Sequence, residues 1–60
     1  MNFIILHGDA DIYVNPEKLS VIFRDEADDG TEFTTVIVDS AEMNVNETPE
    51  EILALVEEAN

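Results

Sequence analysis

Two runs of alternating residues around a tight-turn dipeptide constrain the fold of this chain more than any other feature. From Leu19 to Arg24 and from Glu32 to Val38, the residues alternate with the period of two that is typical of β-strands. Between the two runs lies Asp29-Gly30, the strongest turn dipeptide in the sequence. These features predict a β-hairpin.

Both faces of this predicted hairpin carry apolar residues. We expect the face with Leu19, Val21 and Phe23 to enter the core. A single helix can cover only one face of a sheet, so the second apolar face must meet another layer, a partner or another copy of the chain. We expect this second face to form a homo-oligomer interface, and its residues are Ile22, Val36 and Val38.

Shorter signals place the remaining strands. Residues 3–6 and Ile12-Tyr13-Val14 are apolar or β-branched and flank a turn-rich segment, which predicts a first hairpin. Pro16-Glu17-Lys18 predicts one helical turn or a type I turn, because proline presets the backbone angle that both need. Residues 42–46 predict a short fifth strand.

The clearest helix lies at the end of the sequence. Thr48 with Glu51 forms a capping-box pattern, and Pro49 stands at the first helical position, where its missing N–H costs nothing. The apolar residues that follow recur at helical spacing. The sequence thus predicts a helix from Pro49 to Glu58.

Together these elements predict a single α+β domain over residues 1–60. We expect a small antiparallel β-sheet of four to five strands with the C-terminal α-helix packed on one face. The expected core residues are Ile4 or Ile5, Leu6, Ile12, Val14, Leu19, Val21, Phe23, Phe33, Ile37, Val45, Ile52, Leu53 and Val56.

Composition limits the classes of function. The chain has 60 residues, 15 Asp plus Glu against 2 Lys plus Arg, no cysteine and a formal net charge of −13. With 45% hydrophobic residues it is too apolar for a disordered acidic tail. Such a charge repels nucleic acid and anionic membranes and attracts basic proteins. Since no signal peptide or membrane-spanning run is present, we expect a soluble cytoplasmic protein without membrane insertion.

The order of these signals resembles that of the FlbD-like small proteins. The matching segments are "LHG" at residues 6–8, "IYVNPEKLSVI" at 12–22, "TVIV" at 35–38 and "MNVNETPEEILALVEEA" at 43–59. That family is known from bacterial flagellar operons, with similar proteins in phage genomes, and His7 stands where its members more often have Asn. The resemblance covers nearly the whole chain. It implies a small, homo-oligomeric regulatory or assembly-associated protein with no chemistry of its own.

The acidic loop matches a calcium-binding loop only in part. With Gly30 at the sixth position of an EF-hand loop, Asp25 and Asp29 take the first and fifth positions, but Ala27 and Val36 fall where ligands are needed. We therefore expect no metal and no cofactor. The alternative to a solvated turn is loose binding of a divalent cation by Asp25, Asp28 and Asp29.

The sequence offers no arrangement for catalysis. His7 is the only histidine, and its sequence neighbours include acids but no nucleophile. We expect it to be a surface turn residue, with a switch that titrates near neutral pH as the alternative. We therefore expect this protein not to be an enzyme.

The two cations are too few for direct nucleic-acid binding, since phosphate contacts supply most of that affinity. Lys18 and Arg24 are the only Lys or Arg residues. We expect Arg24 to pair with Glu32 across the hairpin. The alternative is an anion clamp at an oligomer interface.

We expect a non-catalytic protein-binding or regulatory module of FlbD-like kind, bacterial or phage-encoded. The alternative is an acidic DNA mimic that inhibits a basic nucleic-acid-binding host protein, because the net charge of −13 exceeds the roughly 2–8 that solubility requires. Under that alternative, the binding surface consists of Asp25, Glu26, Asp28, Asp29, Glu32, Glu50, Glu51, Glu57 and Glu58.

Overall fold

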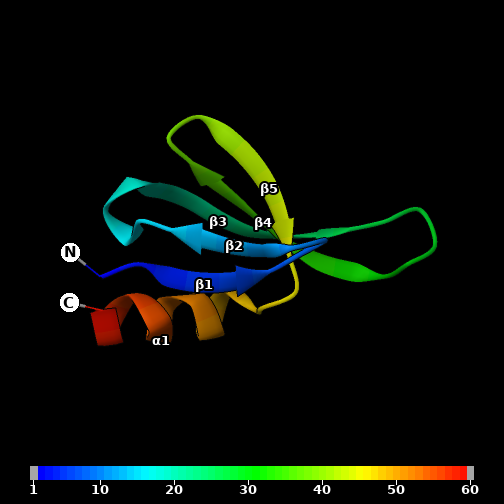
Figure 1. Cartoon of the computed structure of the whole chain (residues 1–60). Helices are drawn as coiled ribbons and strands as arrows, with labels where there is room; N and C mark the ends of the chain where they lie inside the picture. The colour runs from blue at the N-terminus through cyan, green and yellow to red at the C-terminus, as the bar shows by residue number, and fades with distance from the viewer. Residues whose placement is uncertain (1, 60) are drawn as a thin grey trace.

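The computed structural model describes residues 2–59, which form five β-strands, a short 3₁₀-helix and one α-helix. In chain order these elements are β1 (Ile4–His7), β2 (Asp11–Val14), η1 (Pro16–Lys18), β3 (Leu19–Glu26), β4 (Glu32–Val38), β5 (Ala41–Val45) and α1 (Pro49–Ala59) (Figure 1). The predicted antiparallel α+β class is confirmed.

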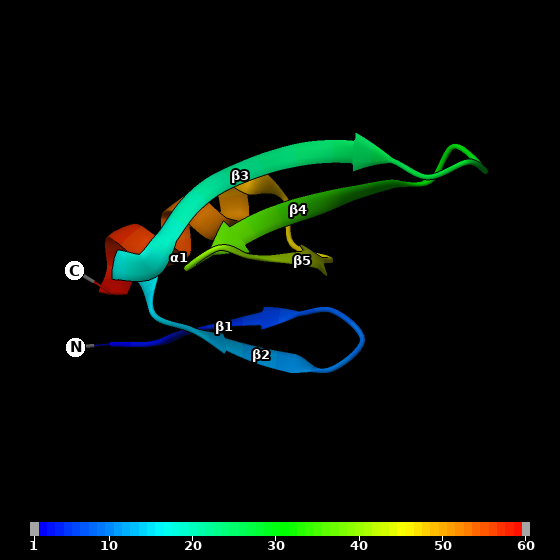
Figure 2. The ribbon, with the colours of Figure 1, turned by 90° about the horizontal axis from the view of Figure 1, so that it is seen from above.

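The five strands divide between two antiparallel sheets, where the sequence predicted one. β1 pairs with β2, and the second sheet has the order β3-β4-β5. η1 separates them: the Asn15 side chain accepts a hydrogen bond from the Glu17 amide at 3.0 Å, and the Lys18 amide donates to the Asn15 carbonyl oxygen at 2.9 Å. This turn redirects the chain, so the β1–β2 hairpin forms a layer apart from the three-stranded sheet (Figure 2).

The β3–β4 hairpin turns through residues 27–31 as its sequence predicts. The Ala27 amide donates to the Thr31 carbonyl oxygen at 2.8 Å, and the Gly30 amide donates to the Ala27 carbonyl oxygen at 2.9 Å. Gly30 has a φ of 89°, a left-handed conformation that glycine adopts without steric cost. This is a three-residue hairpin loop that ends in a glycine bulge.

A second bulge lies at the start of β3. Leu19 lies opposite Val38, but Val21 lies opposite Ile37, so Ser20 is an extra residue on β3. The Ser20 hydroxyl donates to the Ile37 carbonyl oxygen at 3.1 Å. Because paired residues share a face, the bulge places Leu19 and Val21 on opposite faces of the sheet, where simple alternation would have placed them together.

The core lies between the three-stranded sheet, the β1–β2 hairpin and α1. Partly buried residues from the strands and the helix surround a small group of buried apolar side chains. The buried apolar residues are Ile4, Leu6, Val14, Val36, Val45 and Ile52.

The three residues expected at an oligomer interface belong to this core. Val36 is 0% exposed, and Ile22 and Val38 pack against the buried cluster. Their assignment to a free face was wrong, because the alternation is apolar on both faces and cannot choose between them. The bulge adds Leu19 to the face of Ile22, and that face is the one the other layer covers.

Five residues expected in the core lie outside it: Phe33 and Ile37 are half-buried on the opposite face of the sheet, and three more are exposed. Val21 and Phe23 lie on the other face of β3, and Leu53 lies on an open side of α1. Their exposed fractions are 43%, 38% and 57%.

The helix begins with the predicted capping box. The Thr48 amide donates to Oε1 of Glu51 at 2.9 Å, and the Glu51 amide donates to Oγ1 of Thr48 at 3.2 Å. At the other end of the helix, Nδ2 of Asn2 donates to the Ala59 carbonyl oxygen at 3.0 Å. The Asn2 bond ties the end of α1 to the residue before Phe3 and β1, and α1 lies against β1 and β3.

The molecule is elongated, with principal extents of 38 × 21 × 20 Å. The β3–β4 loop projects beyond the core at one end, and α1 lies toward the other (Figure 1). The acidic loop is therefore held at a distance from the helix.

Candidate protein-binding site

The outer face of the three-stranded sheet carries apolar side chains that lie outside the core cluster. This outer face consists of Val21, Phe23, Phe33 and Ile37, since Val21 pairs with Ile37 and these residues alternate with the core positions. Thr35 lies at its centre and is buried, and its hydroxyl donates to Oδ1 of Asn44 at 3.1 Å. The face is therefore an apolar strip bordered by Asp25, Glu42 and Asn44, which pair with its residues and share the face, and the side chain at its centre already has a hydrogen-bond partner.

A groove of about 360 Å³ lies on the opposite side of β3, between this strand and α1. We call it the β3–α1 groove. The exposed side chain of Leu53 forms one wall, and Ile22 forms part of the other. Its lining residues are Pro16, Leu19, Ser20, Ile22, Pro49, Leu53 and Val56.

Acidic side chains border this groove. Glu50 and Glu57 lie three residues before and four residues after Leu53, positions that share its face of the helix, and both are exposed. Glu17 follows Pro16 and is also exposed. The groove is therefore apolar within, and the charged residues next to its lining residues are mainly acidic, with Lys18 beside Leu19 as the one cation.

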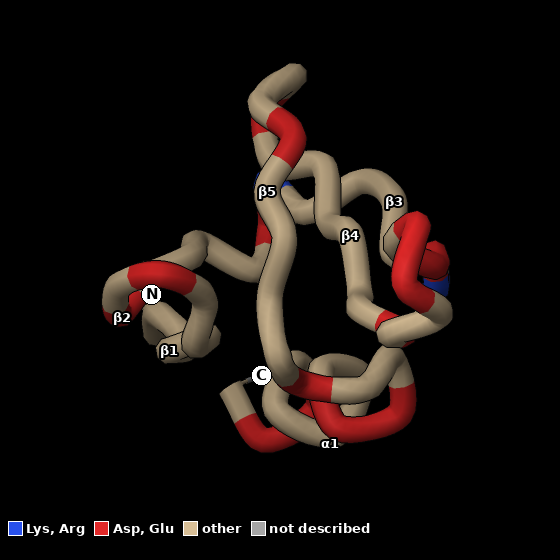
Figure 3. Tube along the Cα trace, turned by 90° about the vertical axis from the view of Figure 1, so that its right-hand side faces the viewer, with Lys and Arg blue, Asp and Glu red and all other residues tan. Residues whose placement is uncertain are grey.

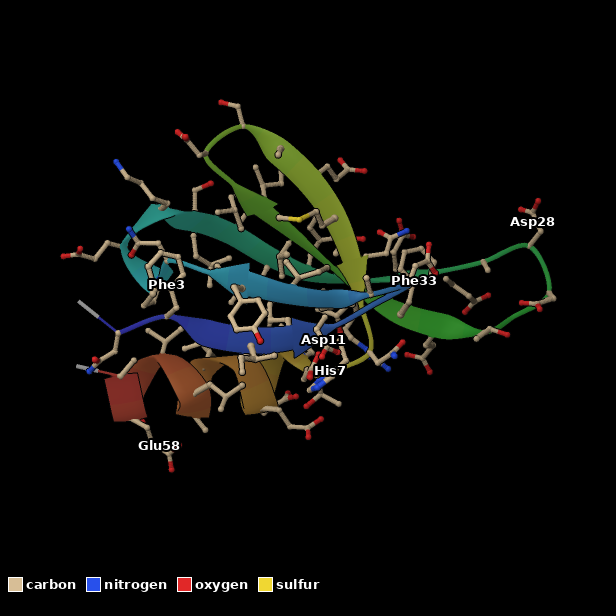
Figure 4. The ribbon with its side chains drawn as sticks, viewed as in Figure 1. Phe3, His7, Asp11, Asp28, Phe33 and Glu58 are labelled. Carbon is tan, nitrogen blue, oxygen red and sulfur yellow. The ribbon has the colours of Figure 1, made fainter. Side chains whose placement is uncertain are left out.

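The nine carboxylates expected to form an acidic surface are all exposed, but they spread along the molecule. Five belong to the β3–β4 hairpin and four to α1. Asp28 at the hairpin tip and Glu58 on the helix lie at opposite ends (Figure 4). Acidic segments also appear on both elements when the molecule is viewed along its length (Figure 3). The structure does not gather them into one patch.

Several of these carboxylates hold local structure. Oδ1 of Asp25 accepts from the Glu26 amide at 2.8 Å. Oδ1 of Asp29 accepts from the Thr31 amide at 2.9 Å, and this backbone hydrogen bond lowers the pKa of Asp29 below its usual value. These two hydrogen bonds give Asp25 and Asp29 a structural role in the loop, so their presence does not require a bound ligand.

Arg24 forms the cross-hairpin ion pair that the sequence predicts. Its Nη2 lies 3.5 Å from Oε2 of Glu32, and its Nη1 donates to Oγ1 of Thr34 at 3.1 Å. Both partners come from β4, opposite the end of β3. The guanidinium thus stabilises the pairing of the hairpin strands.

His7 is the last residue of β1, and its main partner is Glu47 on the segment before α1. The His7 amide donates to Oε1 of Glu47 at 2.9 Å, and its ring Nδ1 lies 2.5 Å from Oε2. Nε2 lies 3.9 Å from Oδ1 of Asp11 (Figure 4). The ring is exposed, as expected, but it joins the first hairpin to the start of the helix.

This pair shifts two pKa values in opposite directions. The hydrogen bond to Glu47, and then its charge, raise the pKa of His7 above 6.5. Partial burial raises the pKa of Glu47, but the hydrogen bonds from the His7 amide and ring outweigh it and lower that pKa below 4.5. The stabilisation from His7 is complete below pH 6.5 and is lost as pH rises through its folded pKa. That from Glu47 is complete above pH 4.5 and is lost as pH falls through its folded pKa.

Within residues 2–59, no group of three or more His, Cys, Asp or Glu side chains is arranged to hold a metal ion. In the same part of the chain, no helix combines the length and apolar character that crossing a membrane requires.

Comparison with family models, with curated proteins and with solved structures gave no significant match. The resemblance to FlbD-like proteins therefore stays a prediction.

Sequence reasoning missed two features of this region. The β3–α1 groove arises because the bulge at Ser20 turns Leu19 toward Ile22, and the sequence carries no signal for that bulge. The contact between His7 and Glu47 joins residues 40 positions apart, a separation that no local pattern reports. Both depend on tertiary packing.

Proposed function

We propose that this protein is a non-catalytic protein-binding module that works in the cytoplasm of a bacterium or of a phage-infected cell. The observation that carries the proposal is the exposure of Val21 and Phe23, side by side on one face of β3, with Leu53 exposed at the groove on the other side. Adjacent exposed apolar side chains are a feature of protein-interaction surfaces. The resemblance to FlbD-like proteins supports the same class of function.

The chemistry of the groove favours binding over catalysis. None of its lining residues is titratable, and its one hydroxyl, that of Ser20, donates to a backbone carbonyl oxygen. A general base or an activated nucleophile needs a titratable group within reach of the substrate. Apolar contacts are what these residues can supply.

Capture with matched variants tests the proposal. Wild-type protein, the double variant Val21→Ser/Phe23→Ser and the control Tyr13→Ser are immobilised and exposed to bacterial lysate. Tyr13 is a 66% exposed aromatic residue on β2, away from the proposed face. We expect salt-resistant partners bound by the wild type and the control to be lost with the double variant. Partners retained by the double variant would contradict a role for the outer face.

A second candidate function is the acidic DNA mimic, and the exposure of all nine carboxylates favours it. A triple variant, Asp25→Asn/Asp28→Asn/Asp29→Asn, removes three charges from the hairpin tip and preserves the side-chain acceptor oxygens. If the mimic is correct, nucleic-acid-binding proteins elute from the wild type at moderate salt and fail to bind the variant. Partners shared by both proteins and resistant to salt would instead support the apolar site.

A further inference from the structure

The free edge of β3 lies between the two apolar surfaces described above. In the three-stranded sheet, β3 pairs only with β4, so its other edge has no strand beside it. The outer face, with Val21 and Phe23, flanks this edge on one side, and the β3–α1 groove flanks it on the other. An exposed strand edge is a template for pairing with another chain.

The hairpin register shows which backbone groups point outward. The bond from the Ala27 amide to the Thr31 carbonyl oxygen closes the hairpin, and hydrogen-bonded pairs alternate from there along an antiparallel ladder. Phe23 therefore points its amide and carbonyl toward β4, whereas Ile22 and Arg24 point theirs to the free edge. Each of these two residues offers one donor and one acceptor.

Both ends of this edge are closed. Toward the loop, the outward amide of Glu26 already donates to Oδ1 of Asp25 at 2.8 Å. Toward η1, the strand bulges at Ser20. Bulges are one way in which proteins block edge pairing, and an amide that already donates a hydrogen bond is not free to pair with another strand. The segment that remains open is centred on Ile22 and Arg24.

Other edges in the described residues are less suited to a partner. The end of β5 is covered by β1: the Asn46 amide donates to the His7 carbonyl oxygen at 2.6 Å, and a Cβ on Gly8 would lie 2.6 Å from the Asn44 carbonyl oxygen. β2 is only four residues long and begins with Asp11. An apolar groove runs beside β3.

We propose that the free edge of β3 binds an extended basic and apolar segment of a partner protein as an added β-strand. Side chains of an added strand alternate between faces. One set would enter the β3–α1 groove against Ile22 and Leu53, and the other would cover Val21 and Phe23. This proposal names the partner segment of the protein-binding function above and depends on it.

Charge complementarity selects a basic segment over a second copy of this chain. The chain carries a formal net charge of −13, and Glu50 and Glu57 border the groove. Two copies paired at this edge would bring like charges together, whereas lysine or arginine at the ends of a partner segment would meet the acidic rim.

A labelled peptide, Lys-Arg-Val-Thr-Val-Ile-Lys-Arg, tests this binding mode by fluorescence anisotropy and amide NMR. Its control has proline in place of both valines, which keeps the charge and removes two backbone donors. We expect the first peptide to bind more tightly. We also expect the amides of Ile22 and Arg24 to become protected from exchange, while the amide of Phe23, already bonded to β4, changes little.

Two variants of one residue isolate the backbone contribution. Arg24→Ala and Arg24→Pro both remove the ion pair with Glu32, but only proline removes the outward amide, and edge strands tolerate proline where the N–H faces solvent. We expect the peptide to bind Arg24→Pro roughly tenfold more weakly than Arg24→Ala. If Arg24→Pro does not fold, the amide protection of Ile22 and Arg24 measured on the wild type decides whether the peptide pairs with the edge of β3.

Three results would overturn strand addition. Equal binding of the two peptides would indicate electrostatic attachment only. Absence of binding would exclude a basic and apolar segment as the partner of this edge. Protection of the Ile22 and Arg24 amides without peptide, in a dimer seen by sedimentation, would assign the edge to a second copy. If any of these occurs while capture still depends on Val21 and Phe23, the proposed function stands and only the strand-addition mode fails.

Discussion

Replacing Val36 and, separately, Val21 with alanine tests which face of the β3–β4 hairpin is inside. The two substitutions remove the same atoms from adjacent strands of one sheet, but Val36 is 0% exposed and Val21 is 43% exposed. At Val36, two fully buried carbon groups lose about 1.6 kcal/mol of transfer free energy, and the cavity raises the total to roughly 2–3 kcal/mol. At Val21, a little over half of the group is buried and water replaces it, so we expect a loss of about 0.9 kcal/mol.

Urea unfolding followed by far-UV circular dichroism measures both losses. A domain of 60 residues has a total stability of roughly 3–9 kcal/mol, so Val36→Ala should remove a large share of it and Val21→Ala should remain well folded. Equal losses, or a larger loss at Val21, would refute the assignment of the Val36 face to the core.

Three further predictions concern the ends and joints of the fold. Thr48→Ala removes the side-chain cap of α1 and should lower the unfolding free energy by about 1 kcal/mol in urea titrations. Gly8→Ala places a Cβ within 2.6 Å of the Asn44 carbonyl oxygen and should lower the unfolding free energy by roughly 1–3 kcal/mol in the same assay. An unchanged unfolding free energy would show that the backbone at Gly8 and Asn44 can move apart to accept the methyl group. In thermal melts, the stability difference between wild type and Glu47→Gln should be largest between about pH 4.5 and 6.5. In that range His7 is protonated and Glu47 is ionised. A stability difference that does not change with pH would contradict the ion pair.

Local signals predicted most of the secondary structure. The capping box at Thr48 and the turn at Asp29-Gly30 are formed as expected, because each depends on residues within a few positions of one another. The ion pair between Arg24 and Glu32 was also predicted, since the hairpin turn sets their register. These features need no information from the rest of the chain.

The candidate site was predicted less well. Val36 was expected on an open face and is buried, whereas Val21 and Phe23 were expected in the core and are exposed. The alternation was read with the correct period but with the wrong face inside. Apolar residues on both faces gave no basis for the choice, and a bulge at Ser20 changed the phase of the pattern.

The sequence by itself determined the α+β class, the strands, the turns and the start of the helix, because propensity, capping and turn geometry act over short stretches of chain. Only the tertiary structure decided which hairpin face is buried, where the β3–α1 groove lies and which edge of the sheet stays free. The physical reason is that burial depends on what the second layer covers, and the β1–β2 hairpin and α1 meet the sheet from distant parts of the chain.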